Sequence, residues 1–204
     1  HIVSRRQRQM CIRDSHNPAP TISGYGDEGA ANHLRISKSH NEKGFEIFVY
    51  GESGFKNDKT SVKRQALEVS RSIAFNHKLD MENTFFLQQN HQAVKEGSFH
   101  NDIVSLSNES VFIAHENAFQ NKDDLNKMLN ILKSKIDNFQ YIEISDSEIP
   151  LKDIINSYLL NSQLITNGDN EMQLILPEEV KGYENCMSWL DKLKQISDVK
   201  LFDF

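Results

Sequence analysis

The sequence predicts an α/β fold built of repeated strand–strand–helix–strand units. Two observations favour it: β-rich runs occur in pairs before the amphipathic helices, and this order recurs at intervals of roughly 60 to 70 residues. A doubly wound parallel sheet would not need hairpins between its helices, which argues against that alternative. Because no linker rich in proline and glycine interrupts the order, we expect residues 16–204 to form one domain.

The first expected unit lies between residues 45 and 89. The run FEIFVY at residues 45–50 ends at a glycine, which is typical of a strand. Apolar residues at helical spacing predict an amphipathic helix across residues 61–77: Val62, Ala66, Val69 and Ile73. The run TFFLQQ at residues 84–89 predicts the strand that follows this helix.

The second expected unit begins with a hairpin. Residues 103–107 and 111–114 flank a polar turn and predict two antiparallel strands. Asn121 is placed to cap a helix with one apolar face, formed by Leu125, Met128, Leu129, Leu132 and Ile136. Residues 141–144 predict the strand after that helix.

The third expected unit occupies the remainder of the chain. A helix at residues 151–160 runs into a strand near residues 163–166, and a second strand at residues 172–176 ends at a proline. Apolar residues at helical spacing mark a last helix: Tyr183, Met187, Leu190 and Leu193. The run VKLFDF at residues 199–204 predicts a final strand.

Composition excludes several classes of function. The 204 residues carry a net charge of −6, which argues against non-specific binding of nucleic acid. No apolar run approaches the roughly 20 residues that a membrane helix needs. Two cysteines are too few for a disulfide-rich secreted scaffold. We therefore expect neither a nucleic-acid partner nor a membrane partner.

Residues 1–15 differ in character from the rest of the chain. They contain four arginines and a single acid, without helical or strand periodicity. The stretch RRQRQMCIRDS at residues 5–15 resembles the translated end of a sequencing-library adapter, and we expect residues 1–15 to be a non-native, disordered segment. A native basic arm is the alternative. Without this segment the chain is more acidic, and Cys186 is its only cysteine.

A first candidate site is the segment GDEGAANH at residues 26–33. Asp27 and Glu28 lie between glycines on an expected loop, which suits close approach to a ligand. Paired carboxylates can bind a planar cation through two hydrogen bonds. The alternative is a solvated turn in which Asn32 and His33 act as a capping element.

A second candidate site is the segment GSFHND at residues 97–102. His100 can act as a general acid or base beside Asp102, since residues two apart in an extended segment face the same side. The alternative is a histidine on a surface loop. A metal site formed by His100, Asp102, His33 and His115 matches no HExxH or CxxC spacing, so we expect no metal.

Two further residues have side chains that could take part in binding or catalysis. Arg64 could bind a substrate carboxylate through two hydrogen bonds, although composition alone favours a solvated helix face. Cys186 lies inside the expected last helix, after several acidic residues. A reactive thiolate favours an electropositive site at a loop or a helix N-terminus, so we expect Cys186 to be a packing residue.

Six segments together resemble the N-succinylarginine dihydrolases, a family within the pentein, or amidinotransferase-like, superfamily. They are GDEGAANH (26–33), FVYG (48–51), QQN (88–90), FHNDIVSLSN (99–108), YLLNSQL (158–164) and MQLILPEE (172–179). The resemblance implies a pentein-type α/β propeller of five strand–strand–helix–strand blades, of which this chain would hold about three. It also implies a cytoplasmic hydrolase of arginine catabolism, a possible homodimer, with no cofactor.

The resemblance also implies roles for particular residues. Glu28 and His100 would be catalytic, whereas Asp102 would bind the substrate guanidinium and Arg64 an acidic end of the substrate. A cysteine thiolate would attack the guanidinium carbon of N2-succinyl-L-arginine, and water would resolve the covalent intermediate. The family's nucleophilic cysteine lies downstream of the strand that matches residues 199–204. We therefore expect an internal segment of a longer enzyme that lacks the nucleophile and is inactive alone.

Two other functions stay open at this point. The first is a related pentein, such as an arginine deiminase or an amidinotransferase, that acts on a different guanidine. The second is a non-catalytic module that retains the fold and binds guanidino compounds. The nature of the substrate separates the first from a succinylarginine dihydrolase, because free arginine and succinylarginine differ at the α-nitrogen.

Overall fold

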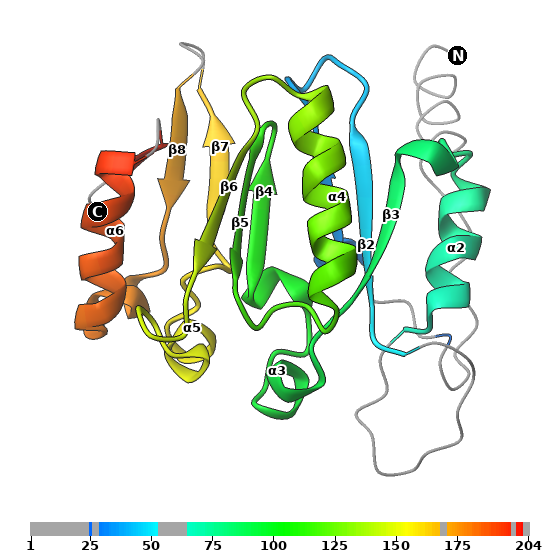
Figure 1. Cartoon of the computed structure of the whole chain (residues 1–204). Helices are drawn as coiled ribbons and strands as arrows, with labels where there is room; N and C mark the ends of the chain where they lie inside the picture. Colours follow the sequence, from blue (N-terminus) through cyan, green and yellow to red (C-terminus); the bar gives the residue numbers. More distant parts are fainter. Residues whose placement is uncertain (1–24, 26–28, 53–64, 168–170, 197–198, 202–204) are drawn as a thin grey trace, which may run out of the picture.

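The computed structural model describes residues 25, 29–52, 65–167, 171–196 and 199–201. In this part of the chain, nine strands form three separate sheets of three strands each. Every sheet pairs its first and second strands antiparallel and its second and third strands in parallel, with a helix between the second and third. The expected strand–strand–helix–strand order is therefore confirmed in these residues, and Figure 1 shows the repeats side by side.

The three repeats consist of corresponding elements. The first contains β1 (His33–Ile36), β2 (Phe45–Tyr50), α2 (Leu67–Asn76) and β3 (Thr84–Gln88). The second contains β4 (Ser105–Asn108), β5 (Val111–His115), α4 (Lys122–Lys135) and β6 (Gln140–Ile144). The third contains β7 (Gln163–Thr166), β8 (Met172–Ile175), α6 (Glu184–Ile196) and β9 (Val199–Leu201).

Short helices connect these elements. They are η1 (Gly29–Asn32), η2 (Met81–Asn83), α3 (His91–Lys95), η3 (Asn101–Ile103), α5 (Leu151–Ser157) and η4 (Glu178–Gly182). Helices α3 and α5 follow the last strands of the first and second repeats, and both lie at the lower end of the molecule in Figure 1. No helix among the described residues is both long and apolar enough to cross a membrane.

The first strands of the repeats connect one repeat to the next. β4 lies against β1 on one side and β7 on the other. The hydroxyl of Ser107 donates to the carbonyl oxygen of Arg35 at 3.3 Å, and the side-chain amide of Asn108 donates to Oγ1 of Thr166 at 2.8 Å. The second and third strands pair only within their own sheets.

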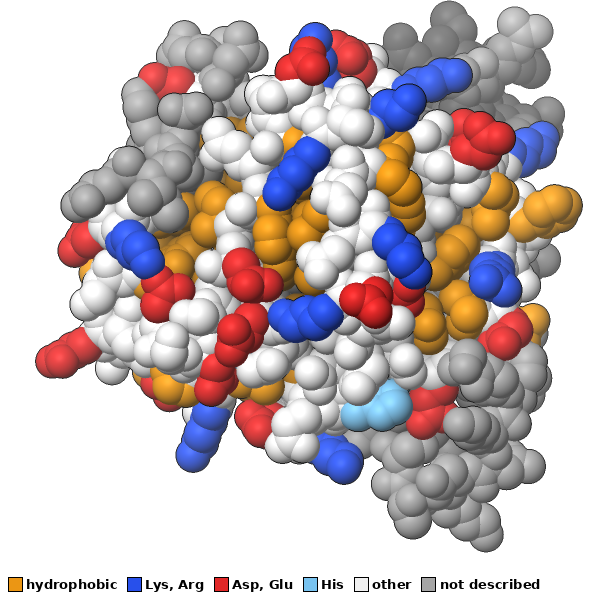
Figure 2. Space-filling model, in the orientation of Figure 1, with side chains coloured by type: hydrophobic (Ala, Val, Ile, Leu, Met, Phe, Trp, Pro, Cys, Tyr) orange, Lys and Arg blue, Asp and Glu red, His pale blue; other side chains and the backbone are white. Residues whose placement is uncertain are grey.

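The hydrophobic core is continuous through the three repeats. All five residues of β5 are buried, because α4 packs on the sheet through the apolar face that its sequence predicts. Asn121 caps α4 as expected: its Oδ1 accepts hydrogen bonds from the main-chain nitrogens of Asp123 and Asp124 at 2.9 and 3.3 Å. Figure 2 shows acidic and basic side chains interspersed on this face, with apolar side chains between them.

Two expected elements begin later than predicted, and one strand was missed. Helix α2 begins at Leu67 because Ala66 is extended and forms a bridge with Glu52; residues 61–64 of the expected helix lie outside the described residues. Strand β4 begins at Ser105, since residues 101–103 form η3 instead. β1 was not predicted, and its pairing partner β2 begins after an intervening turn.

Three expected elements also end earlier than predicted. Helix α5 stops at Ser157, because Tyr158 adopts the left-handed conformation with φ 56°. Strands β3 and β8 each end one residue before the predicted limit. The final strand is described as β9, and residues 202–204 lie outside the described residues.

Candidate functional site

The structure describes two of the four residues to which the sequence assigns a role. His100 and Asp102 belong to the described segment around η3. Glu28 and Arg64, together with Asp27, lie outside the described residues.

His100 and Asp102 do not share an extended segment, and that part of the prediction is wrong. His100 is extended, with φ −123° and ψ 154°, but Asp102 lies in the turn of η3 that follows. The main-chain nitrogens of Ile103 and Val104 donate to the carbonyl oxygens of His100 and Asn101 at 3.4 and 2.9 Å, which closes this turn. The His100 side chain is exposed and the Asp102 side chain is half-buried, so both residues lie at the protein surface.

The two candidate segments that were identified separately in the sequence meet in the fold. Helix η1, which belongs to the GDEGAANH segment, lies against η3. Oδ1 of Asn32 accepts a hydrogen bond from the main-chain nitrogen of Asn101 at 2.8 Å, and both residues are buried. A contact between positions 69 residues apart thus places the end of the first segment beside His100 and Asp102.

A buried polar group supports the main chain on the inner side of His100. Nε2 of Gln89 donates to the carbonyl oxygen of Ser98 at 2.9 Å and lies 3.0 Å from its hydroxyl. Gln89 and Ser98 are both fully buried. In the sequence, Gln89 stands out only as part of the QQN segment, and no short-range signal marks its contact with residues 98–100.

His33 and His115 are both engaged elsewhere in the fold. Nε2 of His33 lies 2.9 Å from Oε2 of Glu46, and its ring centroid is 4.6 Å from that of Phe48. Nδ1 of His115 accepts from the main-chain nitrogen of Asn117 at 3.1 Å, so the neutral ring donates from Nε2 to the carbonyl oxygen of Ile149, also at 3.1 Å. In the described part of the chain, no group of three or more metal-binding side chains gathers.

Cys186 has the environment of a packing residue. It is fully buried on α6, and its thiol donates to the hydroxyl of Ser157 at 3.6 Å. Burial raises the pKa of the Cys186 thiol, and this outweighs the hydrogen bond to Ser157, which lowers it. A raised thiol pKa disfavours the thiolate that nucleophilic catalysis requires.

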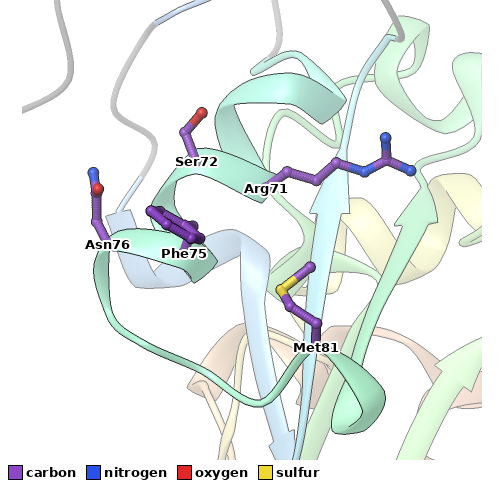
Figure 3. Close-up of a pocket in the computed structure, with 5 residues that line it drawn as sticks. All are labelled: Arg71, Ser72, Phe75, Asn76 and Met81. Atoms are coloured by element: carbon purple, nitrogen blue, oxygen red, sulfur yellow. The ribbon is translucent and has the colours of Figure 1, made fainter.

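A shallow hollow of about 390 Å³ lies away from this segment, on α2 and η2 (Figure 3). It is lined by Arg71, Ser72, Phe75, Asn76 and Met81. The guanidinium carbon of Arg71 lies 5.7 Å from the centroid of the Phe86 ring, so this cation is engaged by the sheet. The hollow contains none of the residues that the sequence singles out.

Comparison with known protein families shows which family the chain belongs to. Residues 8–204 match the family model described as succinylarginine dihydrolase. The chain belongs to this family. The match begins inside the segment 1–15, whose origin in an adapter stays a prediction.

Curated relatives of the succinylarginine dihydrolase family agree with this assignment. The chain is 39% identical over 202 residues to the N-succinylarginine dihydrolase of Ectopseudomonas mendocina, covering 93% of this chain and 44% of the relative. It is 36% identical over 190 residues to that of Idiomarina loihiensis, covering 91% and 42%. The chain thus spans less than half the length of these relatives.

Four chains of solved structures also match this chain. One of them is the N-terminal domain of an arginine dihydrolase from cyanobacteria, bound to its substrate. The match covers 87% of this chain and 49% of that one, with a TM-score of 0.47 and 14% sequence identity.

Proposed function

We propose that the protein to which this chain belongs hydrolyses N2-succinyl-L-arginine. The observation that carries the proposal is the family match across residues 8–204, with relatives that bear the name N-succinylarginine dihydrolase. One substrate cation and two waters give the N2-succinyl-L-ornithine cation, one carbon dioxide and two ammonias. Both carbon–nitrogen bonds to the terminal nitrogens break, as does the bond from the guanidinium carbon to the side-chain nitrogen.

The chemistry of the substrate suits the residues of the candidate site. A guanidinium is planar and cationic, and a carboxylate accepts two parallel hydrogen bonds from it, which is the role we propose for Asp102. Departure of ammonia needs a proton, and His100 is the proposed general acid and base because imidazole exchanges protons near neutral pH. We propose Glu28 as the second catalytic residue and Arg64 as the group that binds a succinyl carboxylate.

The hydrogen bond between Asn32 and Asn101 supports this assembly. It holds η1, at the end of the GDEGAANH segment, against η3, which carries Asp102 and follows His100. A buried contact thereby holds together the two segments, residues 26–33 and 97–102, to which catalytic and substrate-binding roles are proposed. Such a contact limits the positional freedom of catalytic groups, and small displacements of those groups are costly in rate.

We propose that the nucleophile is a cysteine other than Cys11 and Cys186, the two cysteines of residues 1–204. A thiolate adds to the guanidinium carbon, ammonia leaves with a proton from the general acid, and water then displaces the sulfur to give the ureido compound. A second round at the ureido carbon releases the second ammonia, and water displaces the sulfur to give the carbamate of the side-chain nitrogen, which loses carbon dioxide. The raised pKa and complete burial of Cys186 oppose this role. We accordingly propose that residues 1–204 alone do not turn over the substrate.

The repeats suggest how the whole protein is built. We propose that the three described repeats belong to a pentein-type propeller of five blades, with the first strand of each blade innermost. The contacts of β4 with β1 and β7 support this arrangement. A cytoplasmic location, a homodimer and the lack of an organic or metal cofactor complete the proposal.

The experiment is an assay of the protein expressed from its complete gene. We expect two ammonias and one succinylornithine per N2-succinyl-L-arginine, and no turnover of free arginine. Release of citrulline or of an amidino group from free arginine would assign the protein to another pentein activity. Saturable binding of succinylarginine without any ammonia would instead indicate a binding module.

Matched variants connect the assay to the site. His100→Asn and Asp102→Asn should each lower kcat/KM by 100-fold or more, because each removes a group that acts in the transition state. His91→Asn, a change of the same kind at another exposed histidine, should stay within twofold of wild type. The 204-residue chain, assayed by itself, should release no ammonia.

A further inference from the structure

Gln89 lies at a junction of three parts of the fold. It directly follows β3, and it forms a bridge with Phe119 in the connection after β5 of the second repeat. Its main-chain nitrogen donates to the carbonyl oxygen of Tyr50 at 2.9 Å. Its side chain extends to the loop at residues 98–100, which precedes η3. The main chain of Gln89 is therefore fixed independently of its amide group.

The carbonyl oxygen of His100 accepts from three donors. These are the hydroxyl of Ser98 at 3.1 Å, the main-chain nitrogen of Ile103 at 3.4 Å and Nε2 of Gln89 at 3.5 Å. Gln89 also donates to both oxygens of Ser98. The amide of Gln89 and the hydroxyl of Ser98 thus form a buried chain of hydrogen bonds that ends on the main chain of His100.

The orientation of the Gln89 amide is set by this chain. Its Oε1 is buried and has no hydrogen-bond partner in the structure. A flipped amide would turn Oε1 toward the carbonyl oxygens of Ser98 and His100, where acceptor would face acceptor. A buried acceptor left without a partner has a free-energy cost, so donation from Nε2 must outweigh it.

The backbone beside this contact also needs a fixed conformation. Gly97 has φ 114°, a conformation that residues with a side chain rarely adopt. Ser98 in turn donates from its main-chain nitrogen to the carbonyl oxygen of Ala93 at 2.9 Å. The loop therefore approaches His100 from a turn whose shape depends on glycine and on the buried bonds of Ser98.

We propose that Gln89 is a positioning residue for His100. By fixing the carbonyl oxygen of His100, directly and through Ser98, its amide fixes the peptide plane from which the exposed imidazole projects. Gln89 does not touch the substrate. The inference rests on the proposed catalytic role of His100, and it identifies which buried group sets the direction of that side chain.

Kinetics of the protein expressed from its complete gene test the proposal. Gln89→Met keeps the length and the apolar contacts of the side chain but removes both donors. We expect kcat for succinylarginine to fall by roughly 10- to 100-fold while KM stays within twofold, because misplaced catalytic groups lower the rate more than binding. The matched control is Gln88→Met at the adjacent last residue of β3, which should stay within twofold of wild type in both constants.

A double variant separates positioning from general support of the fold. Ser98→Ala should lower kcat by a smaller factor, and adding it to Gln89→Met should change kcat by less than twofold further, since both act through one carbonyl oxygen. Ser98→Ala carries the test by itself where Gln89→Met does not fold. If Gln89→Met folds and keeps kcat within twofold of Gln88→Met, the proposal is overturned.

A second measurement on the 204-residue chain is independent of the activity. The ring signals of His100 in a proton–carbon NMR correlation, assigned with His100→Asn, should shift in Gln89→Met and stay in place in Gln88→Met. Unchanged His100 signals in Gln89→Met overturn the proposal. A shift of these signals in a protein that does not hydrolyse succinylarginine would support the positioning contact while rejecting the proposed function.

Discussion

The main-chain nitrogen of Asn101 donates a 2.8 Å hydrogen bond to Oδ1 of Asn32, across 69 positions of the sequence. Both residues are buried, and the bond joins the two segments in which the catalytic chemistry was predicted. Neither segment reveals this partner by itself. The relationship makes the candidate site a product of the tertiary fold.

Removal of the Asn32 acceptor should loosen the junction of η1 and η3. Asn32→Leu leaves the buried nitrogen of Asn101 without an acceptor, which costs about 1–3 kcal/mol of unfolding free energy. Asn32→Asp keeps an acceptor oxygen, so its free energy of unfolding should fall by less. Urea unfolding of the chain measures both values, and Asn161→Ala, an exposed asparagine, should change stability by less than about 0.5 kcal/mol. An Asn32→Leu variant as stable as that control would contradict the prediction.

The hydroxyl of Thr166 should be needed to hold the second and third repeats together. It accepts from Nδ2 of Asn108 at 2.8 Å and donates to Oε2 of Glu109 at 2.7 Å. Thr166→Val removes both bonds at nearly constant volume and should lower the free energy of unfolding by about 1–3 kcal/mol. Thr166→Ser, which keeps the hydroxyl, is the matched control. A loss of stability in Thr166→Ser with none in Thr166→Val would mean that the methyl group, rather than the hydroxyl, is responsible.

Protonation of His115 should destabilise the fold in mild acid. Burial lowers the pKa of His115 below its ordinary value of 6.5, so the folded state favours the neutral ring. The stability linked to that ring is present above about pH 6.5 and is lost as pH falls toward the lowered pKa, at no more than about 1.4 kcal/mol per pH unit. His115→Gln retains a donor for Ile149 and does not titrate.

Unfolding in urea at pH 8, 6 and 5 measures this dependence on pH. The loss of stability between pH 8 and pH 5 should be smaller in His115→Gln than in wild type, because the difference isolates one titrating ring. If the unfolding free energies of wild type and His115→Gln changed equally with pH, the pKa of His115 would be the same in the folded and unfolded states, and the prediction would be wrong.

Cys186 should behave as a protected core residue. Because burial raises the pKa of its thiol, alkylation of Cys186 in the folded chain at pH 8, followed by mass spectrometry of its peptide, should be slow and should accelerate only when urea unfolds the chain. Cys186→Ala should cost about 1–2 kcal/mol of stability through lost packing. In the protein expressed from the complete gene, Cys186→Ala should leave kcat for succinylarginine within twofold of wild type. A loss of turnover in a well-folded Cys186→Ala variant would assign the nucleophile to this residue.

Local signals were sufficient for several elements of the fold. The bounds of β2 and β7 agree with the predicted ranges, and the cap and apolar face of α4 were predicted residue by residue. These features depend on side-chain periodicity and on one capping side chain, both of which are encoded within a few positions. The order of strands and helices followed from the same information.

Other features depend on partners that are distant in the sequence. β1 is a four-residue strand with two apolar residues, and it is stabilised by pairing with β2 and by contact with β4. Ala66 is extended because Glu52 pairs with it, which overrides the helical spacing of its neighbours. The turn at η3, and the contact of Gln89 with the loop before it, likewise cannot be read from adjacent residues.

The way in which the repeats touch has a consequence for how their sequences can diverge. The first strand of each described repeat contacts a neighbouring repeat, and β3 also contacts α4 of the second repeat, whereas the strand pairing of the second and third strands stays within their own sheets. Substitutions in those outer strands can therefore accumulate separately in each repeat.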